Sequence, residues 1–142
     1  MNEEIIIRPI GRIETQFKTR EELNIPPYKA EAPYNDPNIT GIVHVFEEYI
    51  DGIKDIEPGS SAMLIFHFNK SDGYKLITES PNFEKPVGVF STRSPNRPNG
   101  IGVSVVKFIS IEGSKLTFQG VDMLDGTPLL DIKPFGNKII HK

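Results

Sequence analysis

The sequence predicts a mainly β fold: a small antiparallel β-barrel of about seven strands with short helical insertions, built as one domain from residues 1–142. Three observations support this. Short segments rich in β-branched and aromatic residues recur along the chain, twelve glycines and twelve prolines separate them, and no stretch keeps a strong helical period. Short strands of this kind are typical of an antiparallel barrel or sandwich.

Each expected strand is an apolar or β-branched run bounded by turn-forming residues. The first contains three successive isoleucines, the middle ones carry most of the valines and phenylalanines, and the last follows an Asp-Gly turn. In chain order the expected strands span residues 5–13, 41–46, 62–68, 74–78, 87–90, 101–111, 115–121 and 129–132.

The segments between the strands differ in character. Glu112-Gly113-Ser114 is a compact connection and predicts a hairpin between its flanking strands. Helix is expected only in short pieces, such as residues 46–55. Residues 14–38 hold four prolines and almost no alternation, which predicts a long irregular loop. Such a loop inside a compact domain is often functional.

Charge is distributed unevenly along the chain. The formal net charge is −3, which argues against a protein dominated by binding to phosphate backbones. Residues 85–111 nevertheless carry four basic side chains and no acid, whereas acids crowd into residues 47–57. A locally positive segment on an acidic protein predicts that one specific anionic group is held there.

Several classes of site are disfavoured by composition. The chain has no cysteine, which excludes disulfides, cysteine-based zinc sites and thiol nucleophiles. Three scattered histidines have no consistent spacing, so no metal site is expected. The N-terminal residues resemble neither a signal peptide nor a membrane span, and we expect a cytoplasmic protein without membrane partners.

The strongest local motif runs from Thr92 to Gly102 and contains Pro95 and Pro98. Each proline fixes its own φ and biases the preceding residue toward extended backbone, so the loop is expected to be stiff, with Arg93 and Arg97 projecting from it. A loop that is already ordered loses less entropy when a ligand binds, and guanidinium groups match carboxylates and phosphates. The alternative is an ordinary stiff turn whose arginines form surface ion pairs.

The same segment contains Gly100-Ile101-Gly102, which begins like a dinucleotide-binding glycine motif. The third glycine is missing, and the following residues predict a strand where that motif needs a helix. We therefore reject a Rossmann fold, and with it the common Rossmann-type methyltransferase. Asn99-Gly100 instead predicts a turn with positive φ, and Gly102 a close approach of the backbone.

A second motif places Asp125-Gly126-Thr127-Pro128 between two apolar segments and predicts a sharp turn. Asp125 could accept hydrogen bonds from ribose hydroxyls or face a cation. Taken alone, the motif favours a simpler interpretation, in which this aspartate bonds its own backbone.

Together these segments resemble the TrmO family, also called TsaA-like, of S-adenosylmethionine-dependent methyltransferases. The resemblance begins at residues 8–13, continues through 52–56, and is most specific in residues 87–102 and 124–134. It implies a small β-barrel, a homodimer with the cofactor near the subunit interface, and methylation of threonylcarbamoyl-adenosine beside the anticodon of tRNA. The implied cofactor is S-adenosylmethionine. The implied partner is tRNA, and no binding of DNA is expected.

The resemblance also implies positions for the site. The family's Pro-Arg-Gln segment appears here as Pro26-Pro27-Tyr28 and lacks its arginine, while Asn96 replaces an aromatic residue and Gly100 a proline. The residues implied to contact the cofactor are Pro27, Tyr28, Asn69, Lys70, Arg93, Val103, Gly126, Thr127, Pro128 and Leu129. Expected substrate contacts are Arg97, Asn99 and Lys107.

The expected chemistry is in-line transfer of the sulfonium methyl to a nitrogen, in which the protein mainly orients the reactants. Asp125 is the candidate for receiving the departing proton, with water as the alternative. Three functions stay open: methylation of tRNA, methylation of a small molecule or peptide, and binding of the cofactor without chemistry.

Overall fold

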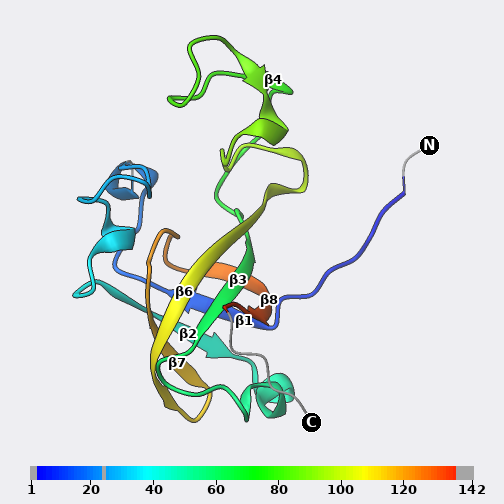
Figure 1. Cartoon of the computed structure of the whole chain (residues 1–142). Helices are drawn as coiled ribbons and strands as arrows, with labels where there is room; N and C mark the ends of the chain where they lie inside the picture. The colour runs from blue at the N-terminus through cyan, green and yellow to red at the C-terminus, as the bar shows by residue number, and fades with distance from the viewer. Residues whose placement is uncertain (1–2, 24, 137–142) are drawn as a thin grey trace.

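A computed structural model describes residues 3–23 and 25–136 and shows a closed six-stranded barrel. Every neighbouring pair of strands is antiparallel. Around the barrel the order is β1 (Gly11–Glu14), β2 (Thr40–Val45), β7 (Lys115–Gln119), β6 (Ile101–Glu112), β3 (Ser61–His67) and β8 (Thr127–Pro134), which pairs with β1 again (Figure 1).

The core is built from the alternate side chains of the strands that point into the barrel. In β2 and β3 every second residue is buried, as expected where one face of a strand points into a barrel. Full burial of each large apolar side chain contributes about 1.5–3 kcal/mol. The largest completely buried side chains are Ile13, Leu64, Phe66, Phe108, Leu116, Phe118 and Leu129.

The β-barrel prediction is confirmed, but six strands close the barrel where about seven were expected. The expected strands at 74–78 and 87–90 shorten to β4 (Ile77–Thr78) and β5 (Val87–Gly88), which form a separate two-stranded sheet. Because β3 and β6 pair directly, the connection between them has no place in the barrel. It projects as an arm of residues 68–100 (Figure 1).

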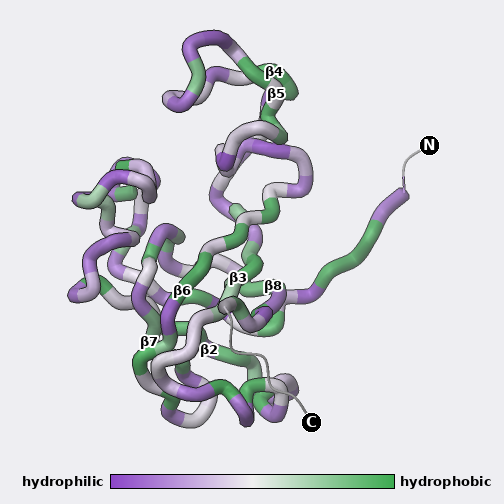
Figure 2. The backbone as a smooth tube through the Cα atoms, viewed as in Figure 1, coloured by the Kyte–Doolittle hydropathy of each residue, from purple (hydrophilic) through white to green (hydrophobic). Residues whose placement is uncertain are grey.

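The first strand was predicted too long. Only Gly11–Glu14 pairs with β2 and β8, whereas Ile5, Ile6 and Ile7 are exposed to 78%, 83% and 53%. These isoleucines lie on an apolar stretch that extends away from the barrel (Figure 2). Apolar composition alone predicted a strand here, but pairing with β2 and β8 begins only at Gly11.

The remaining local predictions agree with the structure. The hairpin between β6 and β7 turns at Gly113, and the short helix within residues 46–55 is the 3-10 helix η3 (Glu47–Ile53). The irregular loop contains η1 (Arg20–Leu23) and η2 (Pro33–Asn35). Two further short helices are η4 (Val89–Ser91) and η5 (Pro98–Gly100).

The turn before β6 has the predicted geometry. Asn99 and Gly100 have φ values of +67° and +57°. A proline, whose φ is fixed near −65°, could not adopt the conformation of Gly100. The glycine at this position therefore fits the local backbone of this chain.

Candidate functional site

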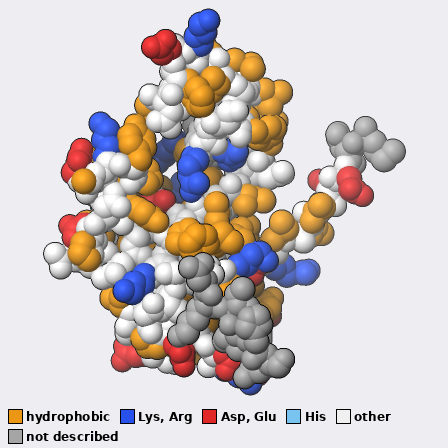
Figure 3. Space-filling view, viewed as in Figure 1, with side chains coloured by type: hydrophobic (Ala, Val, Ile, Leu, Met, Phe, Trp, Pro, Cys, Tyr) orange, Lys and Arg blue, Asp and Glu red, His pale blue; other side chains and the backbone are white. Residues whose placement is uncertain are grey.

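A cavity of about 790 Å³ opens between the barrel and the projecting arm. Its walls come from the irregular loop, the end of β3 and the residues after it, residues 79–82 of the arm, the proline- and arginine-rich loop, the start of β6, residues 121–124 and Thr127. We call it the main cavity. Figure 3 shows Lys and Arg side chains gathered in this part of the surface. Segments far apart in the sequence therefore meet at one concave site.

Most of the predicted site residues line the main cavity. The stiff loop and the segment that leads into the Asp-Gly turn share it, so the two motifs singled out in the sequence lie together. The predicted residues in its lining are Pro27, Tyr28, Asn69, Lys70, Arg93, Arg97, Val103 and Thr127.

Six predicted residues are absent from that lining. Leu129 is fully buried in the core, and its carbonyl accepts a hydrogen bond from Ile10 at 2.7 Å. Lys107 lies exposed along β6, paired with Ser61 and Gln119. Asn99 lines a second, smaller cavity. The others outside the main cavity are Asp125, Gly126 and Pro128.

Arg93 is held in place at the wall of the main cavity. Its Nη2 donates a hydrogen bond of 2.8 Å to the carbonyl of Val103. Its positive charge also lowers the pKa of both Asp122 and Tyr34, although burial of each group outweighs this effect. A guanidinium fixed by backbone in this way can offer its remaining donors to an anionic ligand.

Asp122 lines the main cavity and was missed by the sequence analysis. Burial raises the pKa of its carboxyl to about 6, against the opposing effects of a hydrogen bond from the Ser104 hydroxyl and the charge of Arg93. A carboxylate with such a pKa is a better proton acceptor than an ordinary aspartate. The signal in the sequence was a lone acid inside the apolar run Val121-Asp122-Met123-Leu124.

Tyr34 is a second residue that the sequence analysis missed. Its hydroxyl donates a hydrogen bond of 2.7 Å to the carbonyl of Val105. Burial and the nearby charge of Asp122 raise the pKa of the phenol. Tyr34 thus stays neutral at physiological pH and ties the irregular loop to β6, which closes one side of the main cavity.

Asp125 is already occupied by contacts within the chain. One carboxylate oxygen accepts the backbone N–H of Thr15 at 3.0 Å, and the other pairs with Lys18 Nζ at 2.6 Å. The hydrogen bond from Lys18 lowers the pKa of Asp125. Lys70 donates to the Asp125 carbonyl at 3.0 Å. These contacts fix the Asp-Gly turn and make Asp125 a weaker proton acceptor than Asp122.

Gly102 allows the aromatic wall of the main cavity to form. A Cβ at this position would lie 2.5 Å from Phe68 Cζ and 2.7 Å from Phe66 Cε1. The two phenylalanine rings pack edge to face with their centroids 5.3 Å apart. The close backbone approach predicted for Gly102 is thus made by these rings.

Gly102→Ala is expected to lower the free energy of unfolding by about 1–3 kcal/mol, because the rings must leave their positions to admit a methyl group. Urea denaturation measures this loss. Gly52→Ala is the matched control, since a Cβ there meets no atom within 4 Å. Equal stability of the two variants would show that the rings move freely.

Some kinds of site are absent from residues 3–23 and 25–136. No group of three or more His, Cys, Asp or Glu side chains there could hold a metal ion. Within the same residues, no helix has both the length and the apolar character to cross a membrane.

Comparison with known proteins assigns the fold to a family. The family model of the tRNA-methyltransferase O N-terminal domain matches residues 12–139. A solved structure of TrmO from Pseudomonas aeruginosa superposes with a TM-score of 0.73 at 32% identity, covering 94% of this chain and 57% of that one.

Curated relatives extend the comparison. The chain is 44% identical over 131 residues to a probable S-adenosyl-L-methionine-binding protein of Pyrococcus abyssi, covering 92% of this chain and 68% of the relative. It is 33% identical over 134 residues to the mouse tRNA (adenine(37)-N6)-methyltransferase, covering 92% of this chain and 31% of the mouse protein. The match thus spans a little over half of the solved TrmO chain and about a third of the mouse protein.

Proposed function

Because the chain belongs to the TrmO family, we propose that it binds S-adenosylmethionine in the main cavity and methylates the threonylcarbamoyl-adenosine beside the tRNA anticodon. The observation that carries this proposal is the meeting of the arginine-rich loop with residues 121–124 and Thr127 around one cavity. Arg93 and Asp122 place opposite charges in its lining, which suits a ligand that carries both a carboxylate and a cationic centre.

The main cavity fits the cofactor in size and chemistry. Its volume of about 790 Å³ lies within the range of about 300–1,000 Å³ that is usual for small-molecule sites. Phe66, Phe68 and Met123 provide apolar surface for a nucleoside, Arg93 a partner for the carboxylate, and Asp122 a partner for positive charge. S-adenosylmethionine, when bound, supplies an electrophilic methyl group on its sulfonium.

Asp122 is our candidate for the proton acceptor. As the acceptor nitrogen gains its bond to the methyl carbon, it must lose a proton, and a cavity carboxylate with a pKa of about 6 can take it up near neutral pH. The Ser104 hydroxyl holds this carboxylate in one orientation. The remaining contribution of the protein is to align the reacting groups.

We further propose that the protein acts as a homodimer in the cytoplasm, where its tRNA substrate occurs. Large exposed apolar side chains support a partner subunit. Ile5 and Ile6 on the N-terminal segment are more than three-quarters exposed, and Phe90 beside the stiff loop is exposed to 72%. Exposed apolar surface of this kind marks interaction sites. The Phe90 ring lies 5.9 Å from the guanidinium carbon of Arg97, which lines the main cavity, and this favours a site near the subunit interface.

Calorimetric titration with S-adenosylmethionine, followed by methyl transfer to tRNA, tests the proposal. We expect binding, and transfer to tRNA that carries threonylcarbamoyl-adenosine but not to tRNA without it. Because Lys and Arg side chains of the site would contact tRNA phosphates and release counterions, transfer to tRNA should weaken steeply with added salt.

The outcomes of this assay separate the alternatives. Methyl transfer to a small molecule or peptide, with little dependence on salt, would identify that compound rather than tRNA as the substrate. Binding of the cofactor without any S-adenosylhomocysteine formed would identify a non-catalytic binding module. Failure to bind the cofactor would overturn the proposal.

A further inference from the structure

A second cavity of about 230 Å³ lies beside the main cavity, between the residues that follow β3 and the end of the stiff loop. Its volume is below the range of about 300–1,000 Å³ of drug-sized ligand sites, so it suits a single ring system rather than a whole cofactor. Phe68, Asn69, Ser71, Pro95 and Arg97 line both cavities. A ligand that occupies the main cavity can therefore continue into the second.

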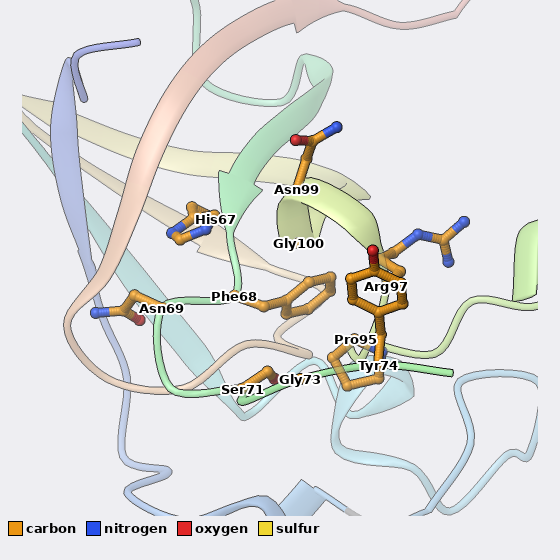
Figure 4. Close-up of a pocket in the computed structure, with 10 residues that line it drawn as sticks. All are labelled: His67, Phe68, Asn69, Ser71, Gly73, Tyr74, Pro95, Arg97, Asn99 and Gly100. Carbon is orange, nitrogen blue, oxygen red and sulfur yellow. The ribbon is translucent and has the colours of Figure 1, made fainter. Parts of the chain in front are cut away.

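The walls of the second cavity are aromatic and polar. Figure 4 shows the side chains of Phe68, Tyr74 and Pro95 around the opening, with His67 on the far side. Tyr74 is 54% exposed, so the ring is accessible for stacking. No carboxylate occurs among the described residues that line this cavity. This combination of rings, amides and one arginine is the chemistry that recognises an unstacked nucleobase.

Arg97 is preorganised at the border of the two cavities. Its Nη1 donates to the carbonyls of Thr92 at 2.8 Å and Ser94 at 3.2 Å, and its guanidinium carbon lies 5.9 Å from the centre of the Phe90 ring. Within the described part of the chain, Nη2 and Nε of Arg97 make no hydrogen bond. These donors suit a phosphate oxygen, since guanidinium binds phosphate with paired hydrogen bonds.

The backbone around the second cavity is also fixed. The N–H of Phe68 donates to the carbonyl of Gly100 at 2.7 Å, which joins the two loops that form the walls. The N–H of Ser71 donates to the carbonyl of Phe68 at 3.1 Å. An ordered site of this kind loses little entropy when a ligand enters.

We infer that the second cavity binds the base of a nucleotide adjacent to the methylated one, stacked on Tyr74, with a backbone phosphate at Arg97. This assignment rests on the proposed function, because it requires the methylated adenosine to lie beside the cofactor in the main cavity. Single-stranded RNA is recognised by splayed bases that stack on aromatic rings, and anticodon loops present such bases. Asn99, one of the substrate contacts expected from the sequence, lines the same cavity.

The test uses the full chain and an anticodon stem-loop RNA that carries the fluorescent base 2-aminopurine on either side of the target adenosine. Wild-type protein should bind and change the fluorescence of one of the two probes. Tyr74→Ala should weaken binding about tenfold and remove that change, because base stacking on an aromatic ring is lost. Tyr74→Phe keeps the ring and should behave as wild type.

Tyr49→Ala is the matched control, since Tyr49 is an exposed tyrosine on η3 that lines neither cavity. Arg97→Gln should reduce the slope of log affinity against log salt concentration by about one, as expected for one lost phosphate contact. The same affinity for Tyr74→Ala and wild type would overturn the inference. So would binding of an acidic peptide, but not RNA, through Tyr74.

Separate readouts distinguish this inference from the proposed function. Methyl transfer that is equal in wild type and Tyr74→Ala, with normal cofactor affinity, would overturn the nucleotide subsite alone. A protein that binds the stem-loop through Tyr74 but does not bind S-adenosylmethionine would retain the subsite and lose the proposed function.

Discussion

Asp122→Asn is expected to lower kcat for methyl transfer about 100-fold, the lower end of what a positioned proton acceptor contributes. The amide is close in shape to the carboxylate and can still accept the hydrogen bond from Ser104, but it cannot take up a proton. Cofactor affinity should change much less than kcat. Single-turnover transfer of a labelled methyl group to tRNA, together with calorimetric titration of S-adenosylmethionine, measures both quantities.

The pH profile gives an independent readout of the same residue. Burial raises the pKa of Asp122 to about 6, and only the ionised form accepts a proton. The single-turnover rate of the wild type should therefore rise through about pH 6 and level off above it. In Asp122→Asn this step should disappear. A pH step that persists unchanged in Asp122→Asn would show that another group produces it.

The thermal stability of Asp122→Asn shows whether a loss of activity comes from the missing proton acceptor or from unfolding. The folded-state pKa of Asp122 is raised above the ordinary value of 3.8. The folded protein therefore binds more protons than the unfolded chain between about pH 4 and 6, and this residue's contribution to stability falls as the pH rises through that window. Asn carries no charge, so at pH 7.5 Asp122→Asn should melt no lower than the wild type.

Asp125→Asn is the matched comparison. Its carboxylate pairs with Lys18 and the backbone of Thr15, so this substitution should lower stability and leave most of kcat. The opposite result, a large loss of kcat in Asp125→Asn and none in Asp122→Asn, would return the role of proton acceptor to Asp125.

The features predicted well from sequence depend on neighbouring residues. Two prolines and Asn99-Gly100 fix the stiff loop through their own φ preferences, and Glu112-Gly113-Ser114 specifies the hairpin of β6 and β7. Signals of this kind survive folding because no distant partner is needed to produce them.

The features that were missed depend on contacts between segments that are far apart in the sequence. Asp122 reaches the cavity because β6 brings Ser104 beside it, and Tyr34 because the irregular loop folds back onto Val105. Nothing local to either residue specifies these contacts. Ile5–Ile7 were likewise predicted to form a barrel strand from their apolar composition, whereas β1 begins only at Gly11. Apolar composition shows that a segment can form a strand, but not whether it pairs with a neighbouring strand in the fold.

Arg93→Ala is expected to weaken S-adenosylmethionine binding about 10- to 100-fold, the loss that corresponds to about 1.5–3 kcal/mol for a hydrogen bond to a charged group. The side chain is anchored to the Val103 carbonyl at 2.8 Å and lines the main cavity, so its free donors can meet the cofactor carboxylate. Calorimetric titration measures the affinity. Arg93→Lys, which keeps the charge but loses the planar fork of donors, should give an intermediate loss.

Arg8→Ala separates a specific contact from a general change in charge, because Arg8 is exposed on the N-terminal segment and lines neither cavity. It removes the same charge and should leave cofactor affinity unchanged. Loss of Arg93 also removes the positive charge that opposes the rise in the pKa of Asp122. The pH step in methyl transfer should therefore move upward in Arg93→Ala. Unchanged affinity together with an unmoved pH step would show that Arg93 neither binds the cofactor carboxylate nor acts electrostatically on Asp122.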